Sequence, residues 1–216
     1  MFTITLNTEL ANAGNLDSYQ LPAYAPSSNA FLAVFVFASN TAVVGSLSGG
    51  PQWAERVTLS HLNTHRISLF TAQSGASPGS ISPTFSCAGD VASGCAIHAY
   101  QITSDAGLVN FRQAGIAEGS GANATISVSD SMQSNGAYIT FLANPEIVSS
   151  PVVSGWTVGN FASYTPPAYR TGSFYKINGL TGTSVQWTNN AVDWAGILLE
   201  VRQGAAVADH YYKQRA

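Results

Sequence analysis

The chain has 216 residues, 45% of them apolar and 11% aromatic, so it can bury a core as large as that of one β domain. Only 9% of its residues are Asp, Glu, Lys or Arg, where an average soluble domain has about 25%. The net charge of −3 and the singly scattered arginines argue against a nucleic-acid-binding protein, which needs clustered basic residues. A surface so poor in charge has little protection against association, so we expect copies of the chain or a partner to cover much of it.

The beginning of the chain lacks both the basic segment and the long apolar segment of a secretion signal. The longest apolar run, residues 31–38, is far shorter than the roughly 20 residues of a membrane-spanning helix. We therefore expect a protein that is made in a cytoplasm and does not enter a membrane. Residues 7–30 combine aromatic residues with proline and are predicted to form an irregular N-terminal arm.

The alternation of apolar and polar residues along the chain predicts an all-β protein. Residues 31–37, FLAVFVF, are apolar on both faces, which indicates a central strand that is covered on both sides. Alternating segments at 66–70, 124–132, 137–143 and 197–202 are separated by turn sequences. About ten strands at this spacing predict one domain, an antiparallel two-sheet β-sandwich of the jelly-roll type. Its core would span residues 30–202, followed by a C-terminal tail at 203–216.

The two cysteines, Cys87 and Cys95, lie on either side of a short loop between strand-like segments. This spacing differs from the CxxC pattern of zinc and redox sites. A disulfide across a hairpin fits the spacing if the protein reaches an oxidising exterior, whereas a cytoplasmic protein would keep both thiols reduced. The sequence leaves both alternatives open.

The sequence contains no pattern that indicates an enzyme or a metal site. It has no closely spaced carboxylates of the kind that a glycosidase on a β-sandwich uses, and no G-x-S-x-G nucleophile motif. His61 and His65 have the HxxxH spacing, but that spacing marks a metal site on a helix, and strand-like segments surround these two residues. We expect no catalytic residue, no metal and no cofactor.

A segment rich in aromatic residues and proline, residues 156–175, is the strongest candidate for a binding site. We expect it to be an irregular insert that packs against something. Three interpretations remain: its aromatic residues cover an open end of the sandwich, contact another protein, or stack on a sugar. Together with two tyrosines of the tail, the candidate contact residues are Trp156, Phe161, Tyr164, Tyr169, Arg170, Tyr211 and Tyr212.

A series of strand and aromatic patterns resembles one known group of proteins. The patterns are Trp53, RISLF at 66–70, ISPTF at 81–85, AIHAY at 96–100 and DWAGILLEVR at 193–202. They resemble those of jelly-roll virion proteins of tailed bacteriophages, which include capsid decoration (cement) proteins and tail-associated adhesion proteins. The resemblance covers residues 30–202 and carries over no catalytic residue. It implies a homotrimer, with the arm and the tail contacting a capsid or a neighbouring subunit.

The sequence thus predicts a non-enzymatic virion structural protein, made in the host cytoplasm. Its first interpretation is a capsid decoration protein that stabilises the shell through contacts with the major capsid protein or other virion proteins. The alternative is a tail-fibre or receptor-binding module with a host glycan as its partner. Neither interpretation involves nucleic acid or a membrane.

Overall fold

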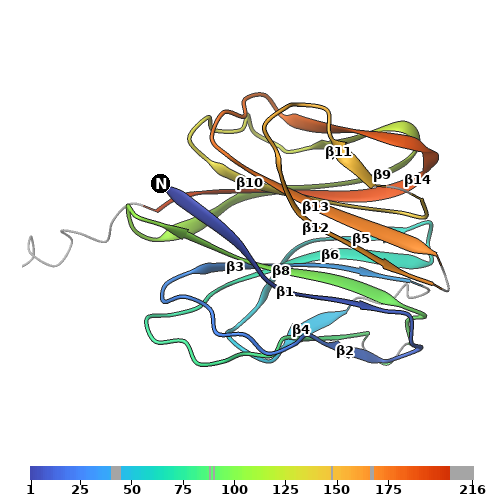
Figure 1. Cartoon of the computed structure of the whole chain (residues 1–216), viewed down its shortest axis with the longest axis horizontal. Coiled ribbons are helices and arrows are strands. Elements are labelled where there is room, and N and C mark those ends of the chain that lie inside the picture. Colours follow the sequence, from blue (N-terminus) through green and yellow to red (C-terminus); the bar gives the residue numbers. More distant parts are fainter. Residues whose placement is uncertain (40–44, 88, 90, 147, 166–167, 205–216) are drawn as a thin grey trace, which may run out of the picture.

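The computed structural model describes residues 1–39, 45–87, 89, 91–146, 148–165 and 168–204. In this part of the chain all regular structure is β, in antiparallel sheets, as predicted. Three sheets are stacked in layers, with the largest sheet at the top of Figure 1 and the smallest at the bottom. The prediction of two sheets was therefore incomplete.

The order of the strands in space differs from their order in the chain in all three sheets. From edge to edge, the five-stranded sheet in the middle consists of β1 (Phe2–Asn12), β8 (Cys95–Ser104), β3 (Phe31–Ala38), β6 (His65–Gln73) and β5 (Ala54–His61). The six-stranded sheet consists of β11 (Val148–Pro151), β14 (Ser184–Gln203), β10 (Ala137–Asn144), β13 (Tyr169–Ile177) and β12 (Thr157–Tyr164), and β9 (Val109–Ser127) also pairs with β14. The three-stranded sheet consists of β2 (Ser18–Gln20), β7 (Thr84–Ser86) and β4 (Ser46–Ser48).

Strand β3 lies at the centre of the middle sheet and is buried on both faces, as predicted. Successive side chains of a strand point to opposite faces. Phe35 and Phe37 therefore pack in the core beneath the six-stranded sheet, whereas Val34 and Val36 pack against the three-stranded sheet. Both covering layers come from the same chain, and this explains why the segment has no polar face.

The six-stranded sheet is curled, and a separate core fills its concave side. Trp187, Trp194 and Phe174 belong to this core. The long strands β9 and β14 pair along nearly their whole length, from Val109 opposite Gln203 to Ser127 opposite Ser184. Gly115 allows β9 to bend back toward its own end, because a Cβ atom at this position would collide with the backbone oxygen of Ser127.

A buried polar cluster links the first part of β9 to β14 and to the segment that follows β9. Glu200 of β14 is fully buried, forms an ion pair with Arg112, and accepts hydrogen bonds from the Gln113 side chain (2.5 Å) and the Gln133 backbone N–H (2.7 Å). The Gln113 side chain also donates to the backbone oxygen of Asp130 (2.9 Å) and accepts from its N–H (3.0 Å). The register of β9 and β14 shifts beside Glu200, and both Arg112 and Gln113 reach this carboxylate.

Of the two segments predicted to be irregular, the aromatic insert consists mainly of regular strands, whereas the arm at 7–30 is strand only at 7–12 and in β2 and is irregular elsewhere. The N-terminal arm begins within β1, which pairs with β8 from Phe2 to Asn12. The aromatic insert forms the hairpin of β12 and β13. Each contains a β-bulge, between Leu6 and Thr8 in β1 and between Val158 and Asn160 in β12. A bulge adds one residue to the strand, so that after it the apolar residues occupy even positions instead of odd ones, or the reverse. The alternation in the sequence is therefore interrupted. Nearly all of the predicted tail lies outside the described residues.

Candidate functional site

Two of the predicted contact residues, Tyr164 and Tyr169, are core residues. They are 5% and 7% exposed and pack in the core between the two larger sheets. The Tyr164 hydroxyl lies 2.6 Å from Oγ of Ser39, and the Tyr169 ring packs against Phe37 with their centroids 4.8 Å apart. These two tyrosines therefore fill the interior between the two larger sheets, and the prediction that they form a contact surface was wrong.

The remaining predicted contact residues have different environments. Trp156 is partly buried and packs against the core of the curled sheet, where its indole N–H has no hydrogen-bond partner among the described residues. Arg170 is exposed at the beginning of β13. Tyr211 and Tyr212 lie outside the described residues.

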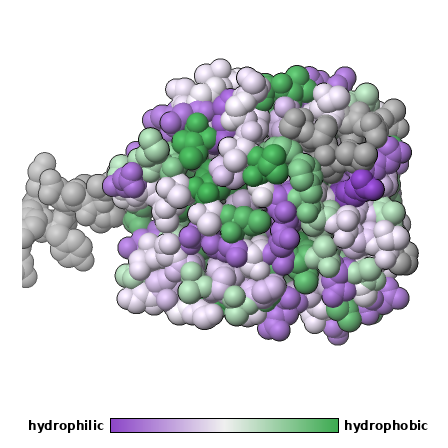
Figure 2. All heavy atoms as spheres, in the orientation of Figure 1, coloured by the Kyte–Doolittle hydropathy of each residue, from purple (hydrophilic) through white to green (hydrophobic). Residues whose placement is uncertain are grey.

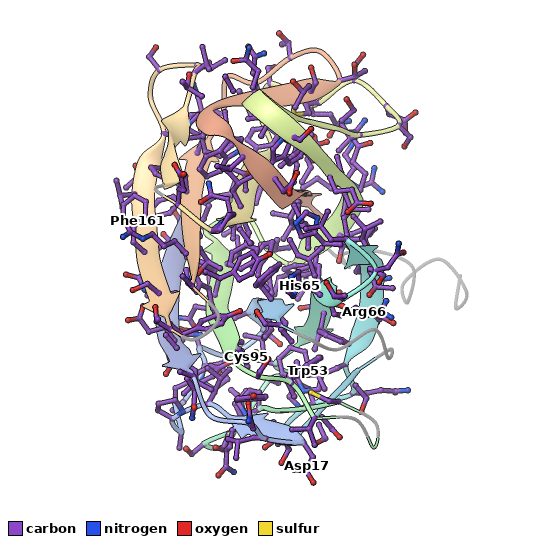
Figure 3. All side chains as sticks on the ribbon, turned by 90° about the vertical axis from the view of Figure 1, so that its right-hand side faces the viewer. Asp17, Trp53, His65, Arg66, Cys95 and Phe161 are labelled. Carbon is purple, nitrogen blue, oxygen red and sulfur yellow. The ribbon has the colours of Figure 1, made fainter. Side chains whose placement is uncertain are left out.

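Among the described residues, Phe161 is the aromatic residue with the most solvent-exposed position, with 50% of its surface exposed. It projects from the outer side of the molecule in Figure 3. Its ring packs edge-on against Phe174, with centroids 5.5 Å apart, and Phe174 packs in the same way against Trp187 at 5.0 Å. Phe161 is thus the exposed end of a row of rings that reaches into the core of the curled sheet, and this packing restricts its motion.

Three valines near Phe161 in the sequence are also exposed. Of the nine large apolar side chains that are exposed among the described residues, four lie between positions 152 and 161. We call these four the β12 face: Val152, Val153, Val158 and Phe161. Figure 2 shows apolar residues interspersed with polar ones on the side of the molecule where β12 lies in Figure 1. The sequence reasoning missed the valines because it singled out aromatic residues only.

The β12 face adjoins an open sheet edge. Strand β12 is the last strand of its sheet and pairs with β13 on one side only. Among the described residues, the backbone N–H and C=O groups along its other side have no strand partner in the sheet, although β1 and β8 of the middle sheet approach β12. An unpaired edge of this kind is a site where a further strand can pair. Exposed apolar side chains beside an unpaired edge are the features of a protein contact surface.

The two histidines of the HxxxH pattern meet across the β5–β6 turn. His61 lies opposite His65 in the strand register, and its Nδ1 is 2.8 Å from a carboxylate oxygen of Glu118. Both rings are buried, and burial together with the nearby His61 lowers the pKa of His65 to about 4. Glu118 and Asp193 line a hollow of about 370 Å³ beside His61. No three His, Cys, Asp or Glu side chains among the described residues are arranged to hold a metal ion.

A buried Ser–His pair lies between the two larger sheets. Nδ1 of His98 is 2.7 Å from Oγ of Ser173, and its Nε2 is 3.2 Å from Oγ1 of Thr171. The Tyr100 hydroxyl is 2.6 Å from the same Ser173 oxygen. His98 and Ser173 have no exposed surface, so a substrate has no path to the serine in this folded form. The geometry supports a structural role in which hydroxyl groups satisfy both nitrogens of a buried imidazole.

No disulfide joins the two cysteines, and both are fully buried in the core next to the three-stranded sheet. Burial and the nearby Cys87 raise the pKa of the Cys95 thiol. The structure therefore describes the reduced alternative, and a disulfide remains a prediction for an oxidised form. Figure 3 places Cys95 within the ribbon, close to the lower, three-stranded layer.

Comparison with known proteins gives no match: no family model, no curated protein and no solved structure is similar to the chain at a significant level. The resemblance to phage virion proteins thus remains a prediction from the strand patterns. Among the described residues, no helix is long and apolar enough to cross a membrane.

Proposed function

We propose that the protein is a non-enzymatic structural protein of a tailed-bacteriophage virion, and that it decorates the capsid. In this proposal the two larger sheets form a sandwich of the jelly-roll type, and the protein is made in the host cytoplasm. It assembles as a homotrimer and contacts the major capsid protein or other virion proteins.

One observation carries the proposal: the β12 face combines four exposed apolar side chains with an unpaired strand edge. The small number of charged residues, 9% of the chain, is consistent with it, because charges are the usual protection against association through such edges. A second copy of the chain is the occupant that we assign to this face. Binding at this face requires only a partner of complementary shape that buries the apolar side chains. Contacts of this kind are the ones through which a cement protein would act.

Sedimentation of the purified chain tests this assembly. We expect a species with three times the 22.5 kDa mass of the chain. The double variant V158K/F161K is expected to sediment as a folded monomer, because two charges on the β12 face would have to be desolvated in the contact. The matched control L16K/L62K adds the same charges at exposed apolar positions outside this face and should remain trimeric. A monomeric native protein, or a trimeric V158K/F161K variant, would contradict the assigned interface.

A further inference from the structure

A second surface of the molecule has a different chemistry. Two hollows of about 500 and 380 Å³ share Asn110 and Arg202 among their lining residues, so they adjoin, and we call the pair the groove. The larger hollow is also lined by Arg56 and Phe111. Among the residues that the structure describes, no aspartate or glutamate lines either hollow. In a chain with a net charge of −3, this groove is a local concentration of positive charge.

Arg56 is held in place before any ligand binds. Its Nε atom donates a hydrogen bond to Oγ1 of the buried Thr71 at 2.7 Å. Its guanidinium carbon lies over the Phe111 ring, 4.5 Å from the centroid. These two contacts fix the plane of the guanidinium and leave its two terminal NH₂ groups without a partner among the described residues. Paired terminal NH₂ groups are the geometry in which arginine binds a carboxylate through two parallel hydrogen bonds.

Arg202 lines both hollows and makes no hydrogen bond or ion pair with the residues that the structure describes. It lies opposite Asn110 in the pairing of β14 with β9. The third arginine nearby differs in this respect, because Arg112 is neutralised by Glu200. The groove therefore presents two uncompensated guanidinium groups, one in the larger hollow and one where the two hollows meet.

Half of the remaining lining residues are uncharged amides. Gln52, Gln73 and Asn110 line the larger hollow, and Gln133, Asn135 and Gln203 line the smaller one. Amides offer both donors and acceptors, which suits the hydroxyl groups of a sugar. The volume is that of a small-ligand site and far exceeds what a single inorganic anion needs. We infer that this groove binds an acidic saccharide, whose carboxylates pair with Arg56 and Arg202 while its hydroxyls meet the amides.

Calorimetric titration of the full-length protein with tetragalacturonate tests the inference. We expect R56Q and R202Q each to weaken binding about tenfold or more, because each removes a charged hydrogen-bonding partner. R170Q removes an arginine that is exposed but does not line the groove, and it should bind as the native protein does. The neutral maltotetraose should show no measurable heat.

Three results would overturn the inference: no binding of tetragalacturonate, equal weakening by R170Q, or equal binding of maltotetraose. Binding of a sulfated tetrasaccharide in preference to the carboxylated one would also contradict the assigned ligand class. The outcome is independent of the β12 face, because V158K/F161K leaves every lining residue of the groove in place and should bind as the native protein does. Failure here thus leaves the proposed assembly intact, and the reverse also holds.

Discussion

Acidification from pH 7.5 to pH 4.5 is expected to lower the free energy of unfolding by about 5 kcal/mol, from two buried histidines alone. Burial lowers the pKa of His98 to about 3, and burial together with His61 lowers that of His65 to about 4. In the unfolded chain both titrate near 6.5. Below that pH the unfolded state binds protons at these two histidines and the folded state does not. The free energy of unfolding therefore falls as the pH falls toward the folded pKa values. Each histidine contributes about 1.4 kcal/mol per pH unit.

The variant H98Q isolates the larger of these two contributions. Glutamine keeps an amide near Ser173 but has no proton to gain in this pH range, so its stability should depend less on pH. Urea unfolding at both pH values is expected to show a decrease for H98Q that is about 2.7 kcal/mol smaller than for the native protein. Equal decreases in the two proteins would show that His98 is protonated in the folded state or is not buried as described.

The variant E200A is expected to lose about 3–5 kcal/mol of folding free energy. Glu200 is fully buried and is the common acceptor for Arg112, the Gln113 side chain and the Gln133 N–H. Without its carboxylate, the Arg112 charge loses its ion pair, the Gln113 side chain loses one of its two acceptors and the Gln133 N–H loses its acceptor, all at a largely buried place. Leaving such groups unpaired costs far more than the ion pair contributes by itself. Urea unfolding measured by tryptophan fluorescence is suited to this variant, because Trp187 and Trp194 lie in the same curled sheet.

The variant E55A is the matched control for E200A. Glu55 is exposed, and its contact is a 3.4 Å hydrogen bond from Ser68. Its removal should change stability by less than about 1 kcal/mol. If E200A and E55A were equally stable, the buried polar cluster would not be what closes the curled sheet.

The regular parts of the fold could be predicted because their alternation is uninterrupted. Residues 31–37 are apolar on both faces, which indicated that β3 lies in the centre of a sheet. The alternation of apolar and polar residues at 137–143 and 197–202 indicated β10 and β14. Strands β1 and β12 were missed because each contains a bulge that moves the apolar positions by one residue. The three-stranded sheet was missed because its strands, such as β7 (Thr84–Ser86), are too short to show a period.

The candidate sites were harder to predict than the strands. The sequence identifies Phe161, Tyr164 and Tyr169 as aromatic residues, but which of them is exposed depends on the bulge in β12 and on the packing of two sheets. The arginine-lined groove brings together Arg56 of β5, Phe111 of β9 and Arg202 of β14. These strands are far apart in the chain, so no local pattern reveals that their side chains meet.

The location of the protein on phage particles tests the proposed function most directly. Antibodies against the purified chain, coupled to gold, would be applied to phage particles from the source of this sequence and examined by electron microscopy. The proposal predicts regular labelling over the head. Labelling confined to the tail would replace decoration by a tail-associated role, and particles that contain none of the chain would contradict a virion function altogether.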